Sequence, residues 1–301
     1  MPLSSRIGCQ LLYHGVLGHE KLLDSKRVEK IFRTWSIREG RRFDSPINPL
    51  PRIRRYIKAY HIDLSDLLEP DLARYATLND FFFRKLRPDA RPIASPQDPT
   101  IVSSAADCRL TVFESVTAAT KLWIKGTHFT LEELLGDSRL AKQMRDGCVA
   151  IFRLAPSDYH RYHSPVDGIV GRTKHLSGTY YTVNSLIVRD KRFNPLGQNK
   201  RDVTVISTSL PGGGTFPVAF VQVGALLVSS IRQSVPRGAV VRRGDELGYF
   251  AYGGSTIVLV TPKDTVEWDA DLVANSRGDN DQTLQLETRV KVGERIGRWR
   301  V

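Results

Sequence analysis

Residues 249–260 read YFAYGGSTIVLV, and this stretch indicates how the second half of the chain is built. It is an apolar run of the kind that forms a buried strand, interrupted by Gly253-Gly254-Ser255-Thr256. Glycine inside a strand pattern commonly marks a β-bulge or a tight turn, so the sequence predicts a break at this point. A chemical role for Ser255 would need a base for its hydroxyl and a group that orients the base.

Short strand patterns of the same kind run from residue 147 onward. Each apolar or alternating run is bounded by glycine or proline, as expected for strands joined by turns. Residues 241–250 and 290–299 share the pattern V-x-x-G-[DE]-x-[LI]-G-x-[FW], whose glycines predict turns between strands. This spacing predicts a compact barrel or sandwich of hairpins. The runs are CVAIFRLA, VTVIST, TFPVAFVQVGALLVSSI, GAVV, YFAY and STIVLV.

The first third of the chain has helical periodicity instead, with apolar residues three, four and seven positions apart. Residues 87–100 (RPDARPIASPQDPT) form a proline-rich connector, and Thr130 with Glu133 predicts a capping box that opens a helix. We therefore expect an α+β fold, with a helical region over residues 1–95 and a mainly antiparallel β barrel or sandwich over residues 96–301. The helical stripes are Val28, Ile31, Phe32 and Trp35; Ile53, Tyr56, Ile57 and Tyr60; and Leu78, Phe81 and Phe82.

The composition is that of an ordinary globular protein, with 41% hydrophobic and 25% charged residues. Its apolar runs are shorter than the roughly 20 residues that span a bilayer. Three scattered cysteines do not form a disulfide framework, which favours an intracellular protein, either soluble or peripheral to a membrane. The N-terminus has no secretory signal pattern, and its lack of acidic residues before Glu20 is a weak indication of organelle targeting.

The net charge of +12 restricts the partners, and more than half of it lies in residues 1–91. The basic clusters at 38–42 (REGRR) and 51–58 (PRIRRYIK) either form a solvated face or suit an anionic membrane surface. They are not accompanied by a zinc-finger or RNA-binding motif, so nucleic acid is not an expected partner.

Candidate proton-transfer groups gather in APSDYHRYHSPVDG, residues 155–168. His160 and His163 are three positions apart, and the nearby Ser-Pro and Asp-Gly pairs argue against a helix, so the two rings should point in different directions. A metal site is not predicted, because no third ligand follows at a telling spacing. A further carboxylate, Asp107, stands in SSAADCRL, residues 103–110.

Taken together, DYHRYHSPVDG, GYFAYGGST and SSAADCR resemble the phosphatidylserine decarboxylases, a family of pyruvoyl-dependent enzymes. Other segments resemble the family in the same order along the chain, from about residue 28 to the C-terminus. Several long motifs in order are far more specific than any one of them. These further segments are YATLNDFFFRKLRPDARPI, IKGTHFTLEELLG, GTYYTVNSL and FVQVGALLVSSI.

The resemblance implies a proenzyme that cuts itself between Gly254 and Ser255, giving a β chain of residues 1–254 and an α chain of residues 255–301. Ser255 would become a covalent pyruvoyl group. The resemblance further implies that Asp107, His163 and Ser255 form the relay for self-cleavage, with the logic of a serine-protease triad. His160 is then expected near the pyruvoyl group, in proton transfer or substrate positioning. No metal or external cofactor is implied.

The implied reaction converts phosphatidylserine to phosphatidylethanolamine and CO2 through a Schiff base on the pyruvoyl carbonyl. An alternative is a pyruvoyl-dependent decarboxylase of a soluble, for example aromatic, amino acid. A remote alternative is a non-enzymatic carrier-type barrel, suggested by the repeated glycine pattern, although no lysine stands at a convincing hairpin tip. A peripheral membrane surface is an expected partner, and a homodimer is left open.

One departure from the family pattern concerns Asp107. The family has Pro-Ala-Asp-Gly where this chain has Ala105-Ala106-Asp107-Cys108. A cysteine has a Cβ that glycine lacks, so a positive φ at residue 108 would be strained.

Overall fold

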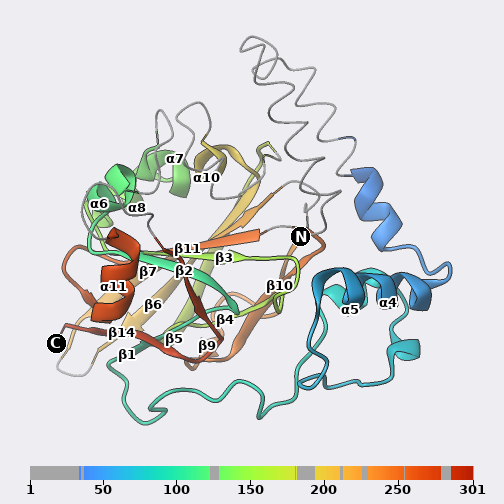
Figure 1. Ribbon diagram of the computed structural model, residues 1–301. Coiled ribbons are helices and arrows are strands. Elements are labelled where there is room, and N and C mark those ends of the chain that lie inside the picture. Colours follow the sequence, from blue (N-terminus) through green and yellow to red (C-terminus); the bar gives the residue numbers. More distant parts are fainter. Residues whose placement is uncertain are drawn as a thin grey trace.

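The structure is a computed structural model, which describes residues 34, 37–122, 129–179, 181, 194–210, 213–225, 230–253, 255–278 and 286–300. The first predicted stripe, Val28 to Trp35, and Gly254 of the predicted cleavage site lie outside these residues. Within them, strands form three antiparallel sheets, and short helices lie on two sides of the sheets (Figure 1).

The largest sheet contains the central strands of the protein. In spatial order its eight strands are β13 (Thr288–Val290), β2 (Cys108–Phe113), β3 (Val149–Leu154), β11 (Ser255–Val260), β7 (Thr215–Gly224), β6 (Arg201–Ser209), β5 (Gly168–Leu176) and β9 (Val240–Val241). All six residues of β11 are buried, because β3 and β7 flank this strand and both of its faces are covered.

Two small sheets cover one face of the large sheet. The first contains β1 (Ile101–Ser103), β14 (Arg295–Trp299) and β12 (Val266–Trp268), and the second contains β4 (Arg161–His163), β10 (Glu246–Ala251) and β8 (Ser230–Gln233). The layers enclose a core that includes Phe152, Phe250 and Ile257. The sheets stay open, so of the two predicted β architectures the sandwich is the one observed.

Helices cover the opposite face of the large sheet. They are α6 (Val116–Leu122), α7 (Leu131–Leu135), α8 (Ser138–Gln143) and α10 (Pro195–Gln198), which lie together above the strands in Figure 1. Leu134, Leu135 and Met144 pack with Ile151 and Val258 in a second core. The predicted cap of α7 is present, since Thr130 Oγ1 accepts a hydrogen bond from the backbone N–H of Glu133 at 3.0 Å. A further helix, α11 (Ala270–Arg277), packs near β2 and β13.

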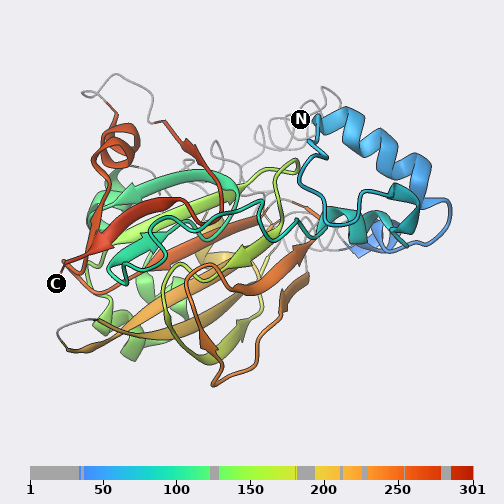
Figure 2. The ribbon, with the colours of Figure 1, turned by 90° about the horizontal axis from the view of Figure 1, so that it is seen from below.

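The remaining helices form a unit to one side of the sheets, seen again from below in Figure 2. They are α4 (Pro49–Tyr60), the 3-10 helix η1 (Leu72–Arg74) and α5 (Leu78–Phe82), preceded by helical residues 37–43. The two predicted stripes in this region fall on α4 and α5 and supply a third core, with Ile53, Phe81 and Phe82 fully buried. No helix among the described residues is long and apolar enough to cross a membrane.

The proline-rich connector, residues 87–100, packs between two turns. One turn belongs to each copy of the glycine pattern shared by residues 241–250 and 290–299. Gly244 and Gly293 have φ of 91° and 85°, the left-handed region that favours glycine. A Cβ at either position would lie within 3 Å of the Ile93 side chain. Ala94 also donates a backbone hydrogen bond to Gly293 O at 2.9 Å. The predicted turns therefore also fix the path of residues 92–94 across the β layers.

The stretch YFAYGGSTIVLV is two strands in different sheets. β10 ends at Ala251 in a small sheet, and β11 begins at Ser255 in the large sheet. The predicted break is thus a passage from one layer to the other, and Gly253 has φ of 128° within it. Strands β1 and β2 were not predicted from the sequence; their partners β14 and β3 lie far along the chain.

Candidate active site

Ser255 lies at the start of the central strand, at the passage between the two layers. Its backbone pairs with Leu154 of β3 and Gly224 of β7, and its side chain is fully buried. The preceding segment is anchored from outside the sheets, because Asn79 Oδ1 in α5 accepts a hydrogen bond from Tyr252 N at 3.0 Å. The helical unit and the large sheet together fix the position of the Ser255 hydroxyl.

His160 is the histidine that contacts Ser255. Its Nδ1 lies 3.3 Å from Ser255 Oγ, and its Nε2 lies 3.0 Å from the carbonyl oxygen of Ala155. A carbonyl oxygen only accepts hydrogen bonds, so this contact assigns the proton to Nε2. Nδ1 then presents a lone pair to the hydroxyl, which is the arrangement required to accept a proton from it.

The surroundings of His160 keep the ring uncharged. The ring is fully buried and stacks on Phe82 of α5, with centroids 4.0 Å apart. Burial, with a smaller contribution from the positive charge of Arg84, lowers the pKa of His160 to about 3, while the bond to Ala155 opposes this shift. At neutral pH the imidazole is therefore free to accept a proton.

The turn at residues 155–158 orients His160. Ala155 O accepts the backbone N–H of Asp158 at 2.9 Å, and the Asp158 carboxylate accepts the backbone N–H of Ala155 at 2.7 Å. Two side chains of the helical unit hold the same turn: Tyr56 donates to Pro156 O at 2.6 Å, and Arg84 donates to Ser157 O at 3.2 Å. The turn thus transmits the position of the helices to the imidazole.

His163 points away from Ser255, as predicted for histidines three positions apart in extended backbone. Its Nδ1 lies 2.8 Å from the carbonyl oxygen of Gly244, and its Nε2 lies 3.3 Å from the hydroxyl of Tyr159. Burial lowers the pKa of His163, so this ring is also biased toward the neutral form. Both of its nitrogens have partners, and neither partner is Ser255 or Asp107.

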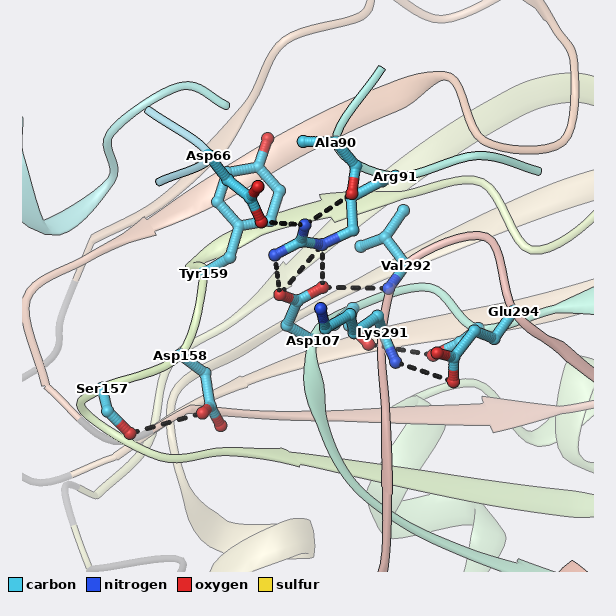
Figure 3. A network of polar contacts seen from close by, with 12 residues as sticks. Asp66, Ala90, Arg91, Asp107, Ser157, Asp158, Tyr159, Lys291, Val292 and Glu294 are labelled. Carbon is cyan, nitrogen blue, oxygen red and sulfur yellow. Dashed lines mark hydrogen bonds and ion pairs between the residues drawn. The ribbon is translucent and has the colours of Figure 1, made fainter. Parts of the chain in front are cut away.

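Asp107 lies in a separate ion cluster (Figure 3). Arg91 binds its carboxylate through Nε at 2.9 Å and Nη2 at 2.6 Å, and the backbone N–H of Val292 donates to it at 2.9 Å. The third nitrogen of Arg91 pairs with Asp66 at 2.8 Å. The structure thus brings Ser255 and His160 together and gives Asp107 and His163 other partners; their relay stays a prediction.

The suspected strain next to Asp107 is absent. Cys108 is the first residue of β2 and is not among the residues with positive φ, so a cysteine fits where the family pattern has glycine. Its side chain is buried. Sequence reasoning missed three groups that shape the site: Phe82 was assigned only to a helical core, and Ala155 and Arg91 carried no signal of their own.

The chain is similar to known proteins over most of its length. A family model described as phosphatidylserine decarboxylase matches residues 78–298. A phosphatidylserine decarboxylase proenzyme of Schizosaccharomyces pombe is 40% identical over 97% of this chain and 29% of its own length. One from Oryza sativa is 43% identical over 90% of this chain and 42% of its own length. The corresponding proenzyme of Chlamydia trachomatis is 40% identical over 82% of this chain and 77% of its own length. The chain spans less than half of the fungal and plant relatives.

Proposed function

This chain belongs to the phosphatidylserine decarboxylase family, and we propose that it converts phosphatidylserine to phosphatidylethanolamine and CO2 after cutting itself between Gly254 and Ser255. The observation that carries the proposal is the contact between Ser255 Oγ and the lone pair of a neutral, buried His160. The names of the relatives, all phosphatidylserine decarboxylase proenzymes, support the substrate and the self-cleavage.

The residues around Ser255 fit a hydroxyl that attacks its own preceding carbonyl. In the proposed step, His160 Nδ1 accepts the hydroxyl proton while Oγ bonds to the carbonyl carbon of Gly254, and the amide C–N bond breaks as the nitrogen gains a proton. The backbone must turn sharply just before the attacked carbonyl. Gly253 allows such a turn, because its φ of 128° is disfavoured for other residues. An imidazole with a pKa of about 3 is a weak base, but the reaction occurs once per chain and tolerates a modest rate.

The alternative step uses the relay of Asp107 and His163, whose positions match the family motifs, in place of His160. His163 would then act beside Ser255 in a state in which its ring leaves Gly244 and Tyr159. Substitution of His160 and of His163 therefore has distinguishable expected effects on self-cleavage.

Elimination across the Ser255 side chain would free residues 1–254 as a carboxylate and leave a dehydroalanine at position 255. Water would then hydrolyse this residue with release of ammonia, which leaves a pyruvoyl group at the start of residues 255–301. That group, once formed, supplies a carbonyl that accepts the electrons released when an α-amino acid loses CO2. His160 lies within hydrogen-bond distance of the atom from which the group is made. Its ring is therefore placed to hold or deliver a proton there. The buried surroundings, which include Phe82, exclude water from this exchange.

A groove of about 590 Å³ in the helical unit supports a lipid substrate. Phe43, Tyr56 and Tyr252 line it, and Tyr252 is three residues from Ser255. Aromatic side chains with arginines around them suit the interface between acyl chains and an anionic headgroup layer. We therefore propose that this side of the helical unit meets the membrane surface. The arginines of the groove are Arg42, Arg52 and Arg55.

The proposal is tested by the intact mass of the purified protein under denaturing conditions, together with CO2 release from carboxyl-labelled phosphatidylserine in vesicles. We expect two chains, the smaller beginning with a pyruvoyl group at position 255, and phosphatidylserine-dependent CO2. A single uncut chain of 33.9 kDa after prolonged incubation would refute self-cleavage, and CO2 from a soluble amino acid alone would refute the substrate.

A further inference from the structure

A polar cavity of about 270 Å³ lies behind the turn that orients His160. It is bounded by the end of α4, the start of β2, the turn at residues 155–158 and the end of β13. We call it the basic hollow and define it by six charged residues of its lining. The ion cluster of Arg91, Asp66 and Asp107, called the Arg91 cluster, lies at its edge and is left out of this definition. The six residues are Arg84, Arg109, Arg289, Lys291, Asp63 and Asp158.

Three cations of the basic hollow lie near carboxylates without forming a direct ion pair: the charges of Arg109 and Arg289 act on Asp158, and that of Lys291 acts on Asp63. Over the described part of the chain, the side chains of Arg109, Arg289 and Lys291 make no hydrogen bond or ion pair. Arg91 offers a contrast at the edge of the cavity, because two carboxylates pair with it there. With the Arg91 cluster included, five cations and four carboxylates line the whole cavity, which therefore carries an excess of one positive charge.

Among these cations, Arg84 is the one whose charge is buried and therefore most costly to leave without an anion. Its side chain is 5% exposed and bonds only to backbone carbonyls, and its Nε–H has no hydrogen-bond partner. The guanidinium stacks over the Phe81 ring, which offsets part of the charge. A buried cation without a directly paired carboxylate is costly, and Asp107 and Asp158 stabilise its charge only from a distance, so an anion placed nearby would be favoured.

Each of the two carboxylates of the basic hollow accepts a backbone hydrogen bond and leaves the nearby cations without a direct contact. Asp158 accepts the backbone N–H of Ala155, and Asp63 accepts that of Ser65 at 2.9 Å. The arginines Arg109 and Arg289 are cross-strand partners in β2 and β13, so their side chains project from the same face of the sheet. Paired guanidinium groups bind the oxygens of phosphate in the bidentate manner that a single ammonium cannot.

We propose that the basic hollow binds a phosphate-type oxyanion through Arg109, Arg289 and Lys291, with Arg84 as the buried charge beneath it. The anion is either the phosphodiester of a lipid headgroup or free inorganic phosphate. The first source rests on the proposed function, whereas the binding of phosphate itself does not. Either ligand would lie across the turn at residues 155–158 from His160, since Arg84 holds that turn at Ser157 O.

The test compares the full chain with the double variant Arg109→Gln/Arg289→Gln. A matched control is Arg145→Gln/Arg237→Gln, which removes two exposed arginines that do not line the basic hollow and are also without side-chain partners among the described residues. Binding of inorganic phosphate is measured by calorimetry on each protein. We expect at least a tenfold weaker affinity in the double variant and no change in the control. Equal affinities in all three proteins, or no binding to the unaltered chain, would overturn the proposal.

A kinetic measurement separates the two sources of the anion. With a short-chain, monomeric phosphatidylserine, a lipid headgroup in the basic hollow predicts a KM raised about tenfold in the double variant, a kcat within twofold, and competition by inorganic phosphate. Free phosphate as the ligand predicts an unchanged KM together with the lost phosphate affinity. If the unaltered chain releases no CO2 but binds phosphate through these arginines, the proposed function fails and the anion site stands.

Discussion

His160 presents its unprotonated Nδ1 to the hydroxyl of Ser255 at 3.3 Å, while its Nε2 is bound to Ala155 O. The ring cannot rotate by half a turn without losing the carbonyl bond, and Phe82 stacks on its face. The uncut chain thus already orients a group that is able to accept the Ser255 proton. The roles of Ser255 as nucleophile and of His160 as base can therefore be tested by substitution.

Ser255→Ala should leave the chain uncut, because the attacking oxygen is removed. The matched control is the neighbouring hydroxyl, Thr256→Val. Thr256 Oγ1 is buried without a hydrogen-bond partner, so its replacement by a methyl group should cost no stability and can add up to about 1 kcal/mol. Intact mass measures cleavage and urea unfolding measures stability. Cleavage in the alanine variant would eliminate Ser255 as nucleophile.

His160→Ala and His163→Ala separate the two candidate bases. If His160 accepts the proton, its loss should slow self-cleavage by about 10²–10⁴-fold, whereas loss of His163 should have a much smaller effect. The rate is followed by gel electrophoresis after rapid purification. The opposite ranking would show that the relay through Asp107 and His163 operates, and Asp107→Asn should then slow cleavage as well.

The stability of the uncut protein should fall in mild acid. The pKa of His160 is lowered to about 3, so between that value and the unfolded value near 6.5 the unfolded chain binds more protons than the folded chain. Stability is therefore full above pH 6.5 and declines as the pH drops toward 3, with a loss on the order of 2 kcal/mol between pH 7 and pH 5. Burial of His163 acts in the same direction.

Urea unfolding of Ser255→Ala at pH 7 and pH 5 measures this loss without interference from cleavage. Adding His160→Gln should remove most of the difference, whereas adding His61→Asn, which changes an exposed histidine, should not. A pH dependence that survives His160→Gln unaltered would mean that other groups cause it.

Arg91→Met should destabilise the protein by roughly 3–5 kcal/mol, because it leaves the carboxylates of Asp66 and Asp107 together without their cation. The control is Arg74→Met. That arginine pairs with Glu69 at 3.0 Å but is 72% exposed, so its loss should cost less than about 1 kcal/mol. Equal effects in denaturant unfolding would show that the cluster around Arg91 is no more than a surface ion pair.

Gly293→Ala should loosen the connector. The residue has φ of 85°, and an added Cβ would lie 2.6 Å from the carbonyl oxygen of Pro92. We expect a loss of about 1–3 kcal/mol and faster proteolysis within residues 87–100. Gly40→Ala is the comparison, since it has no atom within 4 Å of the added Cβ and lies in a helical segment, where alanine is favoured. Unaltered proteolysis of Gly293→Ala would contradict this view of the connector.

Local sequence signals predicted much of the fold. The stripe of Ile53 and Tyr56 became the buried face of α4, the Thr130 cap opened α7, and the repeated glycines adopted turns at Gly244 and Gly293. These features depend on neighbours a few positions apart, so a single sequence contains them. β1 and β2 were missed because they follow the connector without a turn signal, and their partners β14 and β3 lie far along the chain.

The sequence by itself determined the chemical groups of the site: a serine after two glycines, two histidines in one short segment, and carboxylates elsewhere. Only the tertiary structure decided which histidine contacts Ser255. That choice depends on the turn at residues 155–158, which Tyr56 and Arg84 hold from the helical unit about 75 to 100 residues earlier in the chain. Hydrogen bonds between such distant segments form only when the layers pack together, and spacing along the chain carries no record of them.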